Sequence, residues 1–256
     1  MAERNDWAAI VSPWHLDEYI PGFTVPVAAA ATIRPDLPDG PVPDRMSLLH
    51  RAVAEAVARV ERPLLLAGDC PTARAALAGL QRRHRDPAVL WLDAHGDFNT
   101  PAITTSGYLG GMAIAMLTGR TPGLFADPLD LRPVPDAGVI LADARDLDPA
   151  ERDALTASGV QRVAADPAAI TAALAGLGGR PVYVHIDIDI VDGAELPGLR
   201  FPSGPGPSLA QIEACLTAAC SAADVVGAGI ACAWLPAHAG DPGTRDAIGR
   251  LIGALG

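Results

Sequence analysis

The sequence has few cysteines and few basic residues for its length. Four cysteines without a C-x-x-C spacing argue against a disulfide framework or a structural zinc knuckle. We expect Cys215, Cys220 and Cys232 to be small buried hydrophobic residues. With 19 basic against 30 acidic residues, the formal net charge is -11, which disfavours nucleic acids and anionic membranes as partners. A cationic small molecule fits this charge better.

Long apolar segments are also missing. Nowhere do 18 apolar residues follow one another, and the first residues lack a basic stretch followed by an apolar run. We therefore expect a soluble, cytoplasmic protein. Half of the 256 residues are hydrophobic and 19% are charged, which is ample material for a core. The length suits one α/β domain, so we predict a single domain over residues 1–256.

Apolar segments of strand length alternate with amphipathic segments of helix length. This alternation is typical of a parallel sheet covered on both faces, so the sequence predicts a three-layer α/β/α fold with a mostly parallel sheet. The expected strands are 8–11, 64–67, 88–92, 138–142, 182–188 and 225–232. The expected helices are 46–60, 71–83, 149–158, 167–177, 209–221 and 244–255. The segment 21–44 holds six prolines and cannot be regular for long, so we expect it to wrap the surface or to form a wall of the site.

Two of the expected strands run directly into acidic residues. The strand 88–92 is followed by Asp93, His95 and Asp97, and the strand 182–188 carries Asp187 with Asp189 just after it. Residues two apart on a strand point the same way, and α/β proteins place their sites at the carboxyl ends of strands. These five side chains therefore have the spacing of metal ligands.

The charge of this cluster favours cations over a purely structural role. Four carboxylates crowded at one place raise one another's pKa unless cations neutralise them, and two divalent ions would do so. Carboxylate oxygens with one imidazole suit manganese better than zinc or copper, although spacing alone leaves iron, cobalt and zinc open. The alternative is that the aspartates cap helices or anchor loops, which would require a coincidence at two strand ends.

These motifs resemble those of the ureohydrolase superfamily of arginase, agmatinase and formimidoylglutamase. The segment from Asp93 to Pro101 matches the family's D-A-H-x-D and N-T-P sequences, and Asp187 with Asp189 matches its D-x-D sequence. The resemblance covers most of the chain, from about residue 64 to residue 241. It implies an arginase-like fold and a binuclear manganese enzyme that hydrolyses a C–N bond.

The resemblance also implies a role for each ligand. Asp93 and Asp187 would bridge two Mn²⁺ ions, with Asp97 completing the coordination of the first ion. His95 and Asp189 would complete that of the second. A hydroxide held between the ions would be the nucleophile, because two cations lower the pKa of a shared water and stabilise the tetrahedral intermediate. Asp97 would be catalytic as well, passing a proton from that water to the leaving amine.

The first metal ligand of the family is a histidine, and here Cys70 stands in its place. A thiolate can bind manganese, although it is a softer ligand than the ion prefers. Alternatively, Cys70 is inert and the first ion is weakly held. A branch that resembles Nω-hydroxy-L-arginine amidinohydrolase carries cysteine at this position, so we expect Cys70 to be a ligand.

Two further departures concern the substrate. Gly110 stands where arginases carry a histidine that helps to shuttle protons. The glutamate that grips the guanidinium in the family is replaced by Ala233, or by Trp234 in the neighbouring register. A guanidinium is a permanent cation, and binding it beside two metal ions without a carboxylate partner leaves its charge uncompensated.

The contacts for the other end of the substrate are retained. Asn99 and Ser106 match residues that hold the α-carboxylate in arginases, and Asp148 matches the residue near the α-amino group. An α-amino acid is therefore expected as the substrate, although Asp148 could instead cap the helix that begins at Pro149.

An N-hydroxyguanidine is much less basic than a guanidine and can enter as a neutral molecule. We therefore predict hydrolysis of Nω-hydroxy-L-arginine to L-ornithine and hydroxyurea. The alternatives are another guanidino or formimino compound as substrate, or a metal-binding homologue without activity. His185 is expected to be a core residue or to support the ligands from behind, and His238 to be an exposed loop residue and not a substitute proton relay.

Overall fold

A single eight-stranded parallel sheet runs through the molecule. The computed structural model describes residues 7–83, 86–127, 129–235, 237–238 and 240–256. The strand order is β4-β1-β5-β10-β9-β6-β7-β8, and every neighbouring pair is parallel. The prediction of a mostly parallel sheet is therefore confirmed, and the sheet is parallel throughout. A short antiparallel hairpin of β2 and β3 lies apart from it.

The elements follow one another in the alternating order that the sequence predicts. The strands are β1 (Ala8–Ser12), β2 (Trp14–His15), β3 (Glu18–Tyr19), β4 (Ala29–Thr32), β5 (Pro63–Ala67), β6 (Ala88–His95), β7 (Val139–Asp146), β8 (Gln161–Val163), β9 (Val182–Asp187) and β10 (Val225–Ala231). The α-helices are α1 (Val42–Ala58), α2 (Ala73–Gln81), α3 (Ala113–Leu117), α4 (Pro149–Ala157), α5 (Pro167–Ala175), α6 (Leu209–Ala222) and α7 (Pro242–Ala254). Three short 3₁₀ turns are η1 (Leu109–Met112), η2 (Asp136–Gly138) and η3 (Ile188–Ile190).

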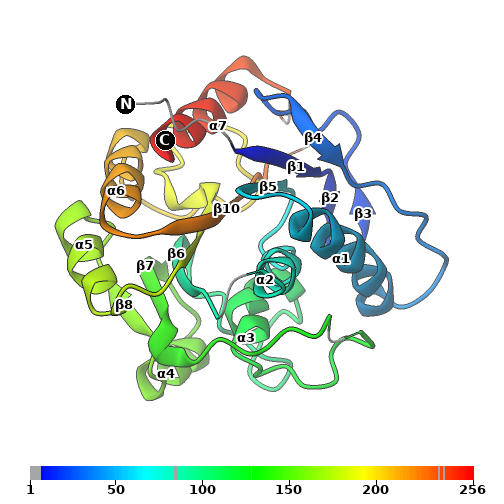
Figure 1. Cartoon of the computed structure of the whole chain (residues 1–256), viewed down its shortest axis with the longest axis horizontal. Coiled ribbons are helices and arrows are strands. Elements are labelled where there is room, and N and C mark those ends of the chain that lie inside the picture. Colours follow the sequence, from blue (N-terminus) through cyan, green and yellow to red (C-terminus); the bar gives the residue numbers. More distant parts are fainter. Residues whose placement is uncertain (1–6, 84–85, 128, 236, 239) are drawn as a thin grey trace.

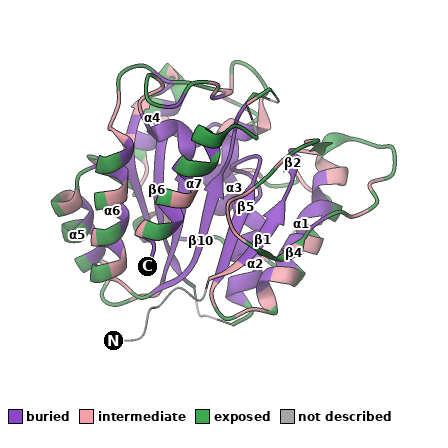
Figure 2. Ribbon diagram, turned by 90° about the horizontal axis from the view of Figure 1, so that it is seen from above, coloured by how far each residue is buried: buried purple, intermediate pink, exposed green. Residues whose placement is uncertain are grey.

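Helices cover both faces of the sheet. In Figure 1, α5, α6 and α7 lie on one side of the strands, and α1, α2 and α3 lie on the other. Alternate residues of a strand serve the two layers: Leu64 and Leu66 of β5 pack into the cluster with α5, α6 and α7, whereas Leu65 packs toward α1 and α2. The central strands β5, β9 and β10 are buried along their length, the edge strands β4 and β8 are largely exposed, and the helices are exposed on their outer sides (Figure 2). This arrangement is the predicted three-layer fold.

The six expected strands and six expected helices are all present, with ends that differ by up to four residues. The proline-rich segment 21–44 is largely irregular, but it adds the edge strand β4 and the first residues of α1. Pro43 lies in the first turn of α1, where its missing N–H costs no hydrogen bond. The short elements β8 and α3 carry too few residues for a clear periodic pattern.

One expectation about the strand that carries the second acidic motif is wrong. The predicted strand 182–188 ends at Asp187, and residues 188–190 form the 3₁₀ turn η3. Asp189 is therefore not on the same side of a strand as Asp187. Instead, the Asp187 carboxylate accepts a hydrogen bond from the backbone N–H of Asp189, at 3.1 Å, and this contact stabilises the turn.

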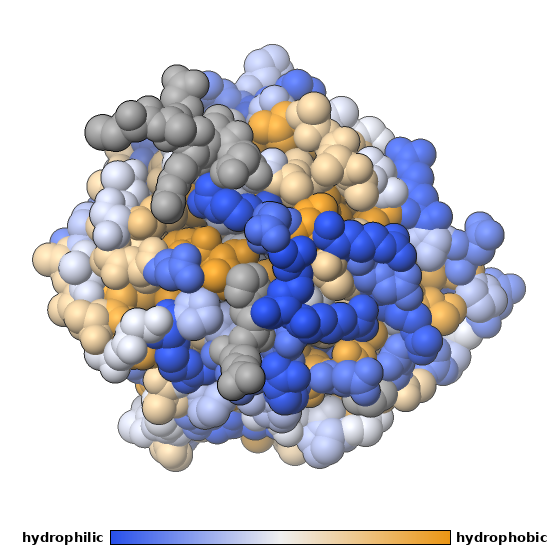
Figure 3. Space-filling model, in the orientation of Figure 1, coloured by the Kyte–Doolittle hydropathy of each residue, from blue (hydrophilic) through white to orange (hydrophobic). Residues whose placement is uncertain are grey.

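The surface shows no single large apolar region in the view of Figure 3. Hydrophilic residues gather across the centre and right of that face, and hydrophobic residues form smaller separate patches. Among the described residues, the exposed large hydrophobic side chains are few, and two of them share helix α1: Tyr19, Val42, Leu48, Phe201 and Leu235. Within the same described residues, no helix combines the length and the apolar character that crossing a membrane requires.

Candidate metal centre

The acidic motifs meet at the carboxyl edge of the sheet. Cys70 follows β5, Asp93 and His95 end β6, and Asp187 ends β9. The last residue of β10, Ala231, pairs with both Ala67 and Asp187, so the ends of β5, β10 and β9 lie level. The candidate ligands thus come from strand ends that run across the sheet from β5, past β10 and β9, to β6.

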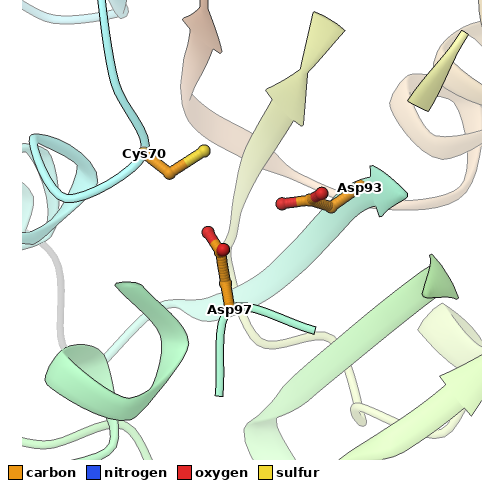
Figure 4. Close-up of side chains that lie close together, drawn as sticks. All are labelled: Cys70, Asp93 and Asp97. Atoms are coloured by element: carbon orange, nitrogen blue, oxygen red, sulfur yellow. The ribbon is translucent and has the colours of Figure 1, made fainter. Parts of the chain in front are cut away.

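Among the described residues, two groups of side chains are close enough to share an ion each. Cys70, Asp93 and Asp97 form the first group, and their side chains point toward one another in Figure 4. Asp93, His95 and Asp189 form the second. Within each group the ligand atoms lie within 4.8 Å of one another. Asp93 belongs to both groups, as a ligand that bridges two ions would.

Asp187 lies at this centre but outside both groups. One of its carboxylate oxygens, Oδ2, is 2.8 Å from Cys70 Sγ, which donates to it. The sixth predicted ligand is therefore next to the first group. Its predicted role as a second bridge stays a prediction.

The position of Asp97 depends on a turn that the strand pattern does not reveal. It lies two residues beyond β6, with φ of 49° in the left-handed region, a conformation uncommon outside glycine and concentrated at functional sites. Glu151 of α4 holds this turn, because its buried carboxylate accepts a hydrogen bond from the Phe98 N–H at 2.8 Å. A Cβ on Gly96 would lie 2.7 Å from the Glu151 carboxyl carbon, so this close approach requires glycine.

Aromatic side chains orient the ligands from behind. The indole N–H of Trp91 donates to Asp93 at 2.9 Å, and the ring stacks on His185 with centroids 3.7 Å apart. His185 Nε2 is 3.3 Å from Cys70 Sγ. His185 is thus behind a candidate ligand and not in either ligand group, as the sequence analysis expected. Burial lowers the pKa of His185 to about 3, so its ring is neutral.

The cluster has the electrostatics of a site that needs cations. Burial and the neighbouring carboxylates raise the pKa of Asp97 and of Asp187 well above the usual value. Burial and the nearby aspartates likewise raise the pKa of the Cys70 thiol. Burial alone would lower the pKa of His95, but its hydrogen bonds to Asp189 and Asp93 raise it to about 12. Without metal, protons on these side chains reduce the negative charge of the cluster.

The donor set fits divalent cations. Asp97 Oδ2 and Asp189 Oδ1 are buried and have no hydrogen-bond partner in the protein, although buried carboxylate oxygens are normally paired. Oxygen ligands with one imidazole suit manganese, and one thiolate is compatible with it. The two unpaired oxygens belong to different ligand groups, so each group has an atom that only a cation or a solvent molecule would satisfy.

A cavity opens over this centre. Its wall is made by residues from seven parts of the chain: His15, Asp69, Cys70, His95, Asp97, Tyr108, Gly110, Gly111, Asp187, Asp189, Phe201 and Ala233. Ala233 lies in this lining, so the substitution of the family's glutamate leaves a methyl group at the cavity wall. Trp234, the alternative in the neighbouring register, is buried and does not belong to the lining.

The three predicted substrate-binding residues lie outside this lining, and two of them, Asn99 and Asp148, are in contact. Asn99 Nδ2 donates to Asp148 at 3.4 Å, and Asn99 Oδ1 is buried without a partner. Ser106 is exposed, and its hydroxyl accepts a hydrogen bond from the Tyr108 N–H. Asp148 is at the N-cap position of α4, yet its side chain makes no capping hydrogen bond and turns toward Asn99. The capping hydrogen bond that the alternative role of Asp148 requires is therefore absent.

Several residues of the centre could not be identified from the sequence motifs. Ser203 lies 3.1 Å from His95 Nε2, and His15 and Tyr108 join the cavity wall from distant segments. No local pattern marks these residues. His238 is outside the cavity lining and is hydrogen-bonded to Asp241 at 2.8 Å, which agrees with the expectation of a loop residue.

Fold and site together define an α/β protein with two adjoining sets of candidate metal ligands at the carboxyl edge of its sheet. A family model described as the Arginase family matches residues 11–240, and the chain belongs to this family. The resemblance expected from the motifs is thereby confirmed.

Known relatives agree with this assignment. The chain is 33% identical over 167 residues to N(omega)-hydroxy-L-arginine amidinohydrolase of Streptomyces lavendulae, over 65% of this chain and 59% of the relative. It is 33% identical over 180 residues to an arginase of Eremothecium gossypii, over 64% of this chain and 44% of that protein. The matched regions thus span about half of these relatives. An arginase structure from Bacillus cereus has the same fold, with a TM-score of 0.82, 20% identity and 97% of each chain covered.

The stability of the protein should depend on Mn²⁺ and on pH together. Burial and Asp93 raise the pKa of Asp189 from 3.8 to about 6, so the metal-free folded state keeps a proton that the unfolded state releases. The free energy of unfolding of the metal-free protein should therefore fall as pH rises from about 4 to 6, and further as Asp97 and Asp187 ionise. A cation replaces these protons, so stabilisation by Mn²⁺ should grow with pH.

The measurement is the melting temperature with excess Mn²⁺ or with a chelator at low and at neutral pH. Saturation at about 100 times the dissociation constant adds about 2.7 kcal/mol per site. We expect a larger Mn²⁺-induced increase at neutral pH. An increase that is absent at both pH values, or that shrinks as pH rises, would contradict the role of the aspartates.

Replacing Cys70 tests the thiolate as a ligand. Cys70→His should keep manganese, whereas Cys70→Ser should weaken its affinity about ten-fold or more, because a hydroxyl does not ionise at neutral pH. Metal content is measured after dialysis, and the protein loaded with Co²⁺ should lose its thiolate charge-transfer absorption in both variants. Cys215→Ser, at a buried cysteine of α6, is the matched control. Full manganese occupancy in both Cys70 variants would show that the thiolate is dispensable.

Proposed function

We propose that this chain is a metal-dependent amidinohydrolase that holds two Mn²⁺ ions and converts Nω-hydroxy-L-arginine to L-ornithine and hydroxyurea. The observation that carries the proposal is the pair of ligand groups that share Asp93. Membership of the Arginase family and the similarity to the Streptomyces lavendulae N(omega)-hydroxy-L-arginine amidinohydrolase support the reaction class.

Two cations suit the composition of the centre. Cys70, Asp93 and Asp97 would hold the first ion, and His95 and Asp189 the second, with Asp93 between them. The four carboxylates and the Cys70 thiolate carry five negative charges when ionised, and two divalent ions compensate four of them. When bound, the ions would make water more acidic and stabilise the negative charge that develops during attack.

The reaction needs one proton to move from water to the leaving amine. Water oxygen adds to the guanidino carbon, the bond from that carbon to the side-chain nitrogen breaks, and this nitrogen leaves as an amine with the proton. Asp97 is suited to carry the proton, because it lines the cavity and its Oδ2 makes no hydrogen bond within the protein. Glu151 holds the turn that carries Asp97, and this turn keeps the Asp97 carboxylate in place.

The choice of substrate follows from charge at the cavity wall. Ala233 offers no carboxylate to a guanidinium, and Gly110 offers no imidazole. The carboxylates that do line the cavity are Asp69 and the candidate metal ligands. Asp69 is occupied, because it accepts hydrogen bonds from the Leu16 N–H and from Thr72. A neutral N-hydroxyguanidine does not need a compensating carboxylate, whereas a permanent guanidinium cation does.

The proposed function is tested with the manganese-loaded protein and a panel of substrates. The panel contains Nω-hydroxy-L-arginine, L-arginine, agmatine and N-formimino-L-glutamate, and the products measured are hydroxyurea, urea and formamide. We expect the highest kcat/KM for Nω-hydroxy-L-arginine. Faster hydrolysis of L-arginine would contradict the charge argument, and no product from any compound would contradict an enzymatic role.

Restoring a carboxylate at the cavity wall should change the preference. Ala233→Glu should raise the ratio of kcat/KM for L-arginine over Nω-hydroxy-L-arginine about ten-fold, because a charged hydrogen bond contributes about 1.5 to 3 kcal/mol. Ala233→Gln has the same size without the charge and should leave the ratio close to its original value. An equal change in both variants would mean that shape, and not charge, sets the preference.

A further inference from the structure

The wall of the cavity contains a hydrogen-bonded pair that no ligand group uses. Tyr108 and His15 come from segments far apart in the sequence, and both line the cavity. The hydroxyl of Tyr108 is 3.0 Å from His15 Nε2. His15 belongs to the small hairpin of β2 and β3, and through this residue the hairpin contributes to the cavity wall.

The hydrogen bonds of His15 fix the direction of this contact. His15 Nδ1 is 2.9 Å from the carbonyl oxygen of Gly68, and a carbonyl can only accept. Nδ1 therefore carries a proton, and in the tautomer whose one proton is on Nδ1, Nε2 accepts from the Tyr108 hydroxyl. Because the hydroxyl proton is used in this way, Tyr108 Oη can offer the cavity only its acceptor lone pairs.

The place of the Tyr108 ring depends on the glycine at position 110. A Cβ on Gly110 would lie 2.1 Å from Tyr108 Cε1, 2.3 Å from Cζ and 2.5 Å from Oη. The hydroxyl end of the ring therefore fills the space in which a side chain at residue 110 would begin. Phe201 packs against the same ring at 5.3 Å between centroids and helps to hold it.

The hydroxyl is close to the candidate metal ligands and stays protonated. Burial, together with Asp69, Cys70, Asp97 and Asp187, raises the pKa of Tyr108 well above its usual value. The phenol is thus a neutral group in the wall of the cavity that the candidate ligands also line. A neutral acceptor stabilises a neutral donor without the charge preference of a carboxylate.

We infer that Tyr108 is a specificity-determining residue whose hydroxyl oxygen accepts a hydrogen bond from the N-hydroxyguanidine group of the substrate, with His15 as its positioning residue. This inference rests on the proposed function and adds the group that recognises the hydroxylated end. A site that hydrogen-bonds a substrate hydroxyl discriminates against the analogue that lacks it, which is L-arginine here.

The test compares wild type with Tyr108→Phe, which keeps the ring and removes the hydroxyl. We expect kcat/KM for Nω-hydroxy-L-arginine to fall about ten-fold or more, kcat/KM for L-arginine to change little, and the manganese content per chain to stay constant. Tyr19→Phe, at a tyrosine that is 40% exposed and outside the cavity, is the matched control. It should change neither kcat/KM value and therefore not their ratio. A ratio of the two kcat/KM values that is unchanged in Tyr108→Phe would overturn the inference.

Two variants of His15 separate positioning from packing. His15→Gln places an amide oxygen near the former Nε2 and should retain most of the discrimination. His15→Asn can donate to Gly68 but does not reach Tyr108, so it should lose discrimination as Tyr108→Phe does. If His15 has a purely structural role, both variants should lower the rates with the two substrates equally. That result would contradict the positioning role of His15.

The failure of the proposed function has a different signature. If the wild-type protein hydrolyses neither compound, the proposed function is wrong, and calorimetric titration with intact Nω-hydroxy-L-arginine tests Tyr108 directly. About ten-fold weaker binding to Tyr108→Phe than to wild type would support the contact. Equal binding to both proteins, or no binding to wild type, would overturn it.

Discussion

The constraint on which this structure depends is the repulsion among four carboxylates that are buried at one edge of the sheet. Asp93, Asp97, Asp187 and Asp189 are all less than 9% exposed. Water cannot screen their charges there, so in the absence of cations the folded protein must keep protons on several of them. Metal binding would exchange those protons for divalent ions, which would link the stability of the fold to the chemistry of the site.

Much of the surrounding chain acts to hold this unfavourable arrangement in place. Trp91 donates to Asp93, and Glu151 fixes the turn that presents Asp97. Arg145 donates to the carbonyl oxygens of Ile190 and Asp189, so its guanidinium secures the turn after β9. These supports come from a strand interior, a helix and a neighbouring strand. The site is therefore built from the sheet and its layers, and not from a single loop.

The periodic part of the molecule could be predicted from its sequence. The six principal strands and helices follow from apolar runs and amphipathic stretches, and the ligand motifs follow from their place after such runs. Strand periodicity explains Asp93 and His95, because both are on β6. It gives the wrong local structure for Asp189, which is on a 3₁₀ turn, and for Asp97, which is on a left-handed turn. Those two positions are set by tertiary hydrogen bonds.

Contacts between distant segments were beyond the reach of sequence patterns. The loss of a histidine at Gly110 can be read from the motif, but the entry of the Tyr108 ring into the same space depends on steric exclusion in three dimensions. Similarly, the hydrogen bond between His15 and Tyr108 joins residues 93 positions apart. The motif thus identifies which family groups are missing, and only the structure identifies what takes their place.

The most direct test of the central claim is the number and position of manganese ions in a crystal of the Mn²⁺-loaded protein, measured by anomalous scattering at the manganese edge. The account predicts two peaks, one beside Cys70 and Asp97 and one beside His95 and Asp189, with Asp93 between them. A single peak, or peaks away from these side chains, would contradict a binuclear centre.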